Sequence, residues 1–102
     1  PELKKEAINF RKEDKEKQLA SSLEVVFKDF EDAKLEVVLY EKQTNLTQKA
    51  LNILLEAYST DGKDFEEILR LERKLLKYSL ELSKSRSQRN TAVAFIDYLL
   101  GN

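Results

Sequence analysis

The sequence predicts an all-α protein that folds as one long antiparallel helical hairpin of the coiled-coil type. Its 102 residues include only two glycines and one proline, so long helices can run without interruption. Apolar residues recur at alternating steps of three and four along most of the chain, which is the pattern of a left-handed coiled coil. That pattern stops once, at residues 59–62, where Ser59, Thr60 and Asp61 precede Gly62. A single interruption between two patterned segments indicates a single turn.

The first helix is expected at about residues 3–58. Its apolar stripe consists of Leu23, Val26, Phe30, Ala33, Val37, Tyr40, Thr44, Thr47, Leu51, Leu54 and Tyr58. A second stripe beside it consists of Leu39, Leu46, Ala50, Ile53 and Ala57. Because one stripe is enough for a single partner, two adjacent stripes indicate that this helix packs against more than one neighbour.

The turn is expected at about residues 59–63 and the second helix at about residues 64–100. Asp64 is placed to cap this helix, and Gly101 follows it where a C-terminal stop belongs. Its apolar stripe consists of Ile68, Leu71, Leu75, Tyr78, Leu82, Ser85, Arg89, Ala92, Ile96 and Leu99. A second apolar flank consists of Phe65, Leu69, Leu76 and Leu80, so this helix too is expected to be covered on two sides.

The two helices differ in length. At a rise of about 1.5 Å per residue the first would be about 84 Å long and the second about 55 Å, which leaves about 19–20 residues of overhang. Most of this overhang, residues 2–18, is charged or amide, so a solvated helix competes with disorder there. A lone two-helix hairpin buries little apolar surface. We therefore expect residues 1–102 to be one hairpin of a larger assembly, completed by copies of itself or by the rest of a longer protein.

Composition argues against several classes of function. The net charge of −1 comes from 18 basic and 19 acidic residues that are closely interspersed, which does not favour a nucleic-acid partner. The chain has no cysteine or histidine, so thiol and imidazole chemistry and zinc sites are excluded. The candidate catalytic carboxylates are Glu66, Glu67 and Glu72, but adjacent helical residues point about 100° apart and would not share a substrate. We expect no enzyme activity and no cofactor.

An ordered set of short motifs in the second half resembles the C-terminal repeat of TolC-like outer-membrane efflux proteins, in particular Bacteroidetes-type members. In that family a long helix ends in Ala-x-x-x-Tyr and turns through a glycine. The next helix begins with a phenylalanine- or serine-led acidic-Val-Leu segment and closes with alanines and Leu-Leu-Gly. The matching residues are Tyr58, Gly62, the run from Lys63 to Leu69, Leu75-Leu76, Ala92-Val93-Ala94 and Tyr98-Leu99-Leu100-Gly101.

The resemblance implies a function in transport. Family members are homotrimers whose outer-membrane β-barrel continues into an α-helical tunnel in the periplasm of a Gram-negative bacterium. This chain would supply a hairpin of that tunnel, with an adaptor protein and an inner-membrane transporter as further partners. It would act in passive export of small molecules or proteins, and it would meet the membrane only through parts that lie outside the hairpin. The alternative is a coiled-coil scaffold or protein-interaction module unrelated to transport.

The resemblance also implies where functional residues lie. The turn would be the periplasmic entrance, where a tyrosine, an arginine five residues later and an aspartate twelve residues later hold the tunnel closed. Tyr58 matches the tyrosine, Lys63 keeps the charge of the arginine, and Arg70 reverses the charge of the aspartate. The candidates for gating or adaptor contact are Tyr58, Asp61, Gly62, Lys63, Asp64 and Arg70.

Each candidate also has a plainer interpretation. Lys63 and Asp64 would serve equally well for turn solvation and capping, while Tyr58 and Tyr78 fit better as packing residues. Arg89 on the stripe would either pair with an acidic residue across the interface or extend its charged end to solvent. A group of small polar residues in the second helix would either allow close helix packing or form polar surface, and polar surface is favoured. These residues are Ser83, Ser85, Ser87 and Asn90.

Overall fold

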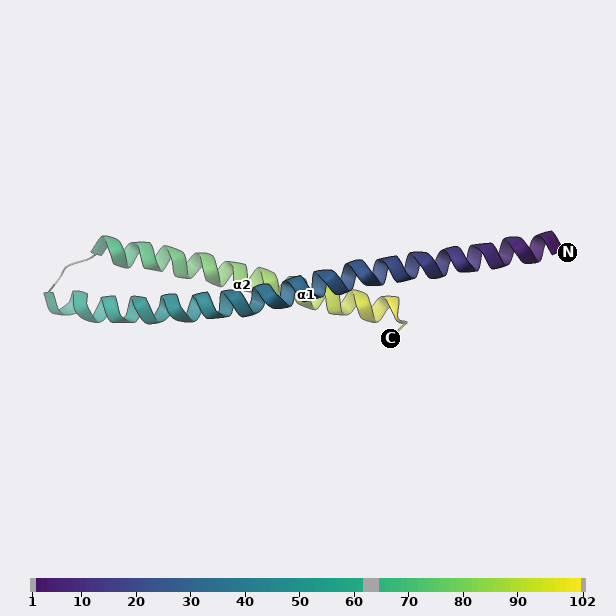
Figure 1. Ribbon diagram of the computed structural model, residues 1–102. Helices are drawn as coiled ribbons and strands as arrows, with labels where there is room; N and C mark the ends of the chain where they lie inside the picture. Colours follow the sequence, from purple (N-terminus) through teal and green to yellow (C-terminus); the bar gives the residue numbers. More distant parts are fainter. Residues whose placement is uncertain (1, 62–64, 102) are drawn as a thin grey trace.

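A computed structural model of the chain shows two long helices that pack against each other as an antiparallel hairpin (Figure 1). The structure describes residues 2–61 and 65–101. Helix α1 spans Glu2–Asp61 and helix α2 spans Phe65–Leu99, and no strand occurs within these described ranges. The hairpin measures 89 × 21 × 13 Å. The predicted fold class, an all-α antiparallel hairpin, is confirmed.

A continuous seam of side chains joins the two helices. The first-named apolar stripe of each helix is buried or half-buried in it, with Tyr58 at the end of α1 the one exception, at 36% exposed. The buried apolar residues are Val26, Ala33, Val37, Leu51, Ile68, Leu82 and Ala92. Steps of three and four keep these residues on one side of each helix, so burial follows directly from their spacing.

The end of α1 differs from the predicted turn. Residues 59–61 were expected to stop the helix, yet α1 continues through Asp61. The Ser59 hydroxyl donates a hydrogen bond of 2.9 Å to the carbonyl oxygen of Glu56 one turn earlier, which satisfies the serine without breaking the helix. The predicted cap at Asp64 lies outside the described residues.

The other end of the hairpin shows the expected helix stop. The Leu100 amide donates to the Ile96 carbonyl at 2.9 Å, and the Gly101 amide donates to the Tyr98 carbonyl at 3.1 Å. Gly101 has a φ of 77°, a left-handed conformation that glycine adopts without a steric penalty. Residue 101 therefore ends α2, as its position in the sequence predicted.

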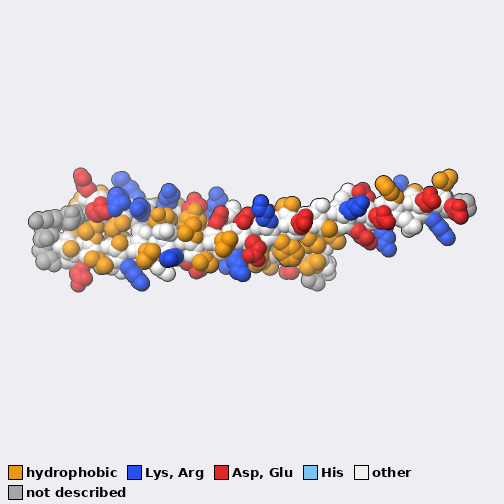
Figure 2. All heavy atoms as spheres, viewed as in Figure 1, with side chains coloured by type: hydrophobic (Ala, Val, Ile, Leu, Met, Phe, Trp, Pro, Cys, Tyr) orange, Lys and Arg blue, Asp and Glu red, His pale blue; other side chains and the backbone are white. Residues whose placement is uncertain are grey.

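Residues 2–21, which we call the overhang, extend α1 beyond the end of α2 (Figure 1). The structure places them in helix, and all of their side chains are exposed. Figure 2 shows charged side chains of both signs over this segment, whereas hydrophobic side chains gather along the paired part. Of the two interpretations of residues 2–18, the structure shows the helical one.

Candidate interaction surfaces

The tip of the hairpin contains the residues that the sequence marked for gating or adaptor contact. Tyr58 near the end of α1 lies against Phe65 at the start of α2, with ring centroids 6.0 Å apart. This contact favours the packing interpretation of Tyr58. Asp61 is the last residue of α1, and the structure does not describe its side chain. The same holds for the whole of Gly62, Lys63 and Asp64, so no geometry is assigned to them.

Arg70 pairs with its own helix. Its guanidinium binds both carboxylate oxygens of Glu67, three residues earlier, and the Nε bond measures 2.9 Å. Both side chains are exposed. The hydrogen bond from Arg70 lowers the pKa of Glu67, and the same bond raises the pKa of the guanidinium. Arg70 therefore has an acidic partner within its own helix.

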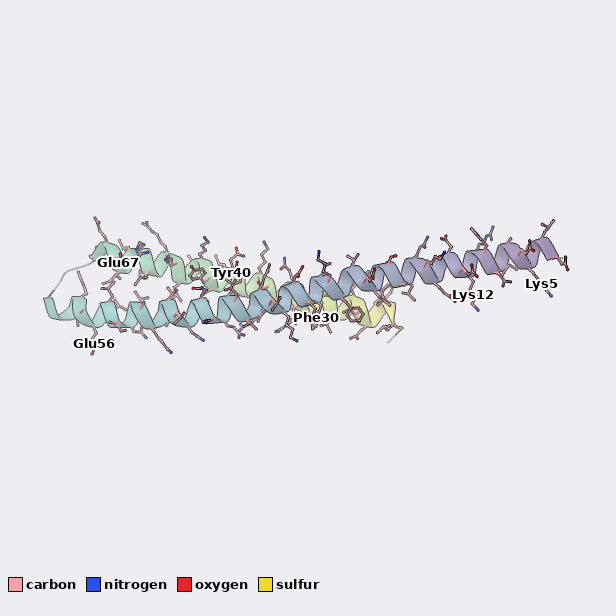
Figure 3. The ribbon with its side chains drawn as sticks, in the orientation of Figure 1. Lys5, Lys12, Phe30, Tyr40, Glu56 and Glu67 are labelled. Atoms are coloured by element: carbon pink, nitrogen blue, oxygen red, sulfur yellow. The ribbon has the colours of Figure 1, made fainter. Side chains whose placement is uncertain are left out.

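Polar contacts cross the seam in the middle of the hairpin. The Tyr40 and Tyr78 rings face each other with centroids 6.3 Å apart, which supports the packing interpretation of Tyr78 (Figure 3 labels Tyr40). Arg86 on α2 donates a hydrogen bond to the Glu41 carboxylate on α1 at 3.1 Å. Sequence reasoning missed this ion pair, although each residue is four positions after a seam residue on its helix.

Ser85 is the deepest side chain of the described hairpin, at 1% exposed. Its hydroxyl donates to the Glu81 carbonyl at 2.8 Å and approaches the Glu36 carboxylate across the seam at 3.3 Å. The expectation that this serine belongs to a polar surface was wrong, because a seam position facing α1 has no route to solvent. The surface interpretation is confirmed for Ser83, Ser87 and Asn90, which are exposed.

Arg89 also lies on the seam, but it is only half-buried. Within the described ranges no ion pair includes it. Its stem therefore packs while its charged end reaches water, which is the second of the two predicted arrangements.

Two apolar surfaces remain uncovered on the hairpin. We call the first the α1 flank, formed by Leu39, Leu46, Ala50, Ile53 and Ala57. We call the second the α2 flank, formed by Phe65, Leu69, Leu76 and Leu80. Apart from Leu69, which is half-buried, these residues are exposed, and Ile53 and Leu76 reach 70% and 61%.

The two flanks lie on opposite faces of the hairpin. Residues seven apart follow one line along a helix, and Phe65 shares such a line with Arg86. The α2 flank is therefore on the face of the Glu41–Arg86 pair. Ala50 and Ala57 share a line with Glu36, which lines the other face. Each face therefore offers its own apolar flank to a further helix from another hairpin.

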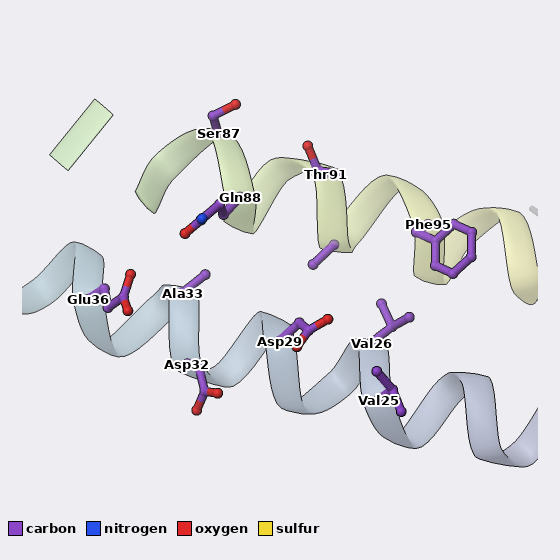
Figure 4. A pocket seen from close by; sticks show the side chains of 11 residues that line it. Val25, Val26, Asp29, Asp32, Ala33, Glu36, Ser87, Gln88, Thr91 and Phe95 are labelled. Atoms are coloured by element: carbon purple, nitrogen blue, oxygen red, sulfur yellow. The ribbon is translucent and has the colours of Figure 1, made fainter. Parts of the chain in front are cut away.

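A groove of about 560 Å³ opens on the face of the α1 flank, near the overhang. Figure 4 shows its α1 side, with acidic and valine side chains, and its α2 side, with Gln88 and Phe95. The small seam residues Ala33 and Ala92 both line it, so the hollow results from two alanines where larger residues would fill the space.

Comparisons of the chain with protein-family models, with curated proteins and with solved structures found no match. In the described residues, neither helix has a stretch long and apolar enough to cross a membrane. Nor do these residues include a cluster of three or more His, Cys, Asp or Glu side chains that could hold a metal ion.

Proposed function

We propose that the hairpin is a segment of the helical periplasmic tunnel of a trimeric, TolC-like outer-membrane export duct. In this proposal it lines or supports a passive channel, with an adaptor protein and an inner-membrane transporter as partners, and it performs no catalysis. The tip would point toward the adaptor. The proposal combines the resemblance of the tip and α2 motifs with the surfaces that the hairpin leaves uncovered.

The observation that supports it most is the pair of flanks on opposite faces. A seam alone would satisfy a two-helix protein, because one apolar stripe per helix covers one partner. Two different uncovered flanks suit a hairpin with a different neighbour on each side. Such unlike contacts repeat from subunit to subunit and close into a ring, which is the geometry that a tunnel wall requires.

Export measurements in the host bacterium test the proposal. Deletion of the gene should raise the cellular accumulation of a fluorescent pump substrate, and the intact gene should restore export. A tip variant, Lys63→Glu with Asp64→Lys, should fail to restore export at unchanged protein abundance. The matched control, Glu31→Lys with Lys42→Glu, makes the same charge exchange on exposed sites of α1 and should restore it.

The alternative, a coiled-coil scaffold unrelated to transport, predicts a different location and phenotype. Fractionation of the cells should place the protein in the outer-membrane fraction if the duct proposal is correct. Recovery in the cytosol, with unchanged accumulation of the substrate after deletion, would exclude the duct and leave the scaffold.

A further inference from the structure

One side of α1, beside the seam, changes in charge along its length. Ile8, Lys15, Ser22, Asp29 and Glu36 follow one another at intervals of seven, so they lie along one line of the helix. The line is basic in the overhang and acidic next to α2. Ser22 marks its midpoint.

The basic end is a compact patch in the overhang. It is lined by Ile8, Arg11, Lys12 and Lys15, all of them exposed (Figure 3 labels Lys12). No part of α2 reaches this segment, because the overhang extends beyond the end of α2 (Figure 1). An apolar side chain and three long basic side chains thus share one surface with no neighbour in the same hairpin.

The acidic end is the groove between the helices. Its α1 side contributes Asp29, Asp32 and Glu36, with Val25 beside them, and its α2 side contributes Phe95 (Figure 4). Asp29 and Asp32 form no ion pair within the ranges that the structure describes. The groove is therefore apolar at its base, acidic along one rim and open to a helix that brings basic side chains.

The two ends are complementary when a second α1 is laid antiparallel with its Ser22 opposite Ser22. Lys15 then lies opposite Asp29, since both belong to the line of Ser22 and their numbers add to 44. Arg11 meets Asp32 beside them, because these two residues share the adjacent line through Gln18 and Val25. Each of these contacts occurs twice, as a two-fold axis requires. Near the axis Leu19 lies opposite Val26, which shares its line on the seam side of Ser22, so the centre of the contact is apolar.

We propose that two copies of this chain associate antiparallel about a two-fold axis at Ser22, each placing its overhang in the groove of the other. The stem of Lys12 covers the apolar base of the groove beside Ala33, while the charged ends of Lys15 and Arg11 meet Asp29 and Asp32 at its rim. Each end of the dimer becomes a three-helix bundle, which covers an overhang that a single hairpin leaves bare. The pairing concerns the 102-residue chain itself. It does not rest on the export proposal, and it would not occur within an assembled duct, where every tip would point the same way.

Charge exchange tests the pairing on the full 102-residue chain. Light scattering should give twice the chain mass at low salt, with less dimer as salt is added. Arg11→Glu with Lys15→Glu, and Asp29→Lys with Asp32→Lys, should each weaken the dimer roughly tenfold or more, since four attractive contacts become repulsive. An equal mixture of the two variants should recover the dimer, because every overhang then meets an opposite charge. A chain that carries all four substitutions should also form the dimer.

A control variant separates this effect from net charge. Lys17→Glu with Lys28→Glu changes the total charge as much as the overhang variant does, but both residues lie off the line from Ile8 to Glu36. Its dimer should match that of the unmodified chain. A monomer at all concentrations, or equal weakening by the control, would overturn the proposal.

Disulfide trapping tests the register, because the chain has no native cysteine. Ser22→Cys should link two chains rapidly under mild oxidation, whereas its exposed neighbour Ser21→Cys should not. A mixture of Lys15→Cys and Asp29→Cys chains should form the mixed dimer. Lys15→Cys alone should not link to itself, since two copies of residue 15 would lie about 21 Å apart. Equal trapping at Ser21, or self-linking at residue 15, would contradict the antiparallel arrangement.

Discussion

Arg86 on α2 donates a hydrogen bond to Glu41 on α1 across the hairpin, with 3.1 Å between Nη2 and Oε1. Each residue lies four positions after a seam residue, Leu82 or Val37, so the pair sits beside the seam. The contact fixes which faces of the helices adjoin and identifies the face that holds the α2 flank. Both side chains are about half exposed, so solvent screens the pair.

A double-mutant cycle should measure a small coupling between these residues. Glu41→Gln, Arg86→Gln and the double variant are expected to give a coupling of about 0.2–1 kcal/mol in the free energy of unfolding, because exposed ion pairs contribute little. Urea unfolding followed by circular dichroism supplies the values. The coupling should fall as sodium chloride is added. A coupling that persists at high salt would show that the pair is less screened than its exposure indicates.

Two leucines on α2 should differ in their contribution to stability. Leu82 is in the seam at 9% exposed, whereas Leu80 is on the α2 flank at 61%. Leu82→Ala removes a packed side chain and should lower the free energy of unfolding by about 2 kcal/mol or more. Leu80→Ala should change it by less than about 0.5 kcal/mol. Urea unfolding of monomeric protein checks both values, and similar losses would show that the flank is covered in the hairpin itself.

The hairpin could be predicted from sequence because its stability depends on periodic side chains. Val37 and Ile68 are buried for the reason that made them recognisable, namely their place in an unbroken run of three- and four-residue steps. Leu46 and Leu76 belong to flanks that the sequence predicted to be covered by further neighbours, and within the single hairpin they are exposed, since two helices share one seam.

Three features were missed from the sequence, each for a different reason. Ser59 lies within α1 with its hydroxyl bonded to the carbonyl of Glu56, although residues of this type tend to end helices. Ser85 is buried because of its seam position, although its type suggested surface. The groove could not be predicted because it requires Ala33 of α1 and Ala92 of α2 to line one hollow, which the register of the hairpin decides.

The burial of Ser85 leads to a prediction about size. Ser85 is already covered by α1, so a larger leucine at this position would be overpacked. Ser85→Leu should therefore lower the free energy of unfolding by about 1–3 kcal/mol. Ser83→Leu makes the same change on an exposed site of α2 and should have an effect within about 0.5 kcal/mol. Thermal unfolding by circular dichroism compares the two. A stabilising Ser85→Leu would mean that the seam has unfilled space at this layer.

The pKa of Glu67 should depend on Arg70. The hydrogen bond from Arg70 holds it below the ordinary value of 4.5, so the charged carboxylate is favoured in the folded helix. This contribution to stability is present above the ordinary pKa and is lost as the pH falls through the lowered one. Arg70→Gln should move the pKa of Glu67 up toward its ordinary value, as measured by carbon-13 NMR of the side-chain carboxyl during an acid titration. Arg73→Gln removes an equal charge from a residue that makes no such bond and should leave this titration in place. If both substitutions shifted Glu67 equally, general charge around the helix rather than the Arg70 contact would set its pKa.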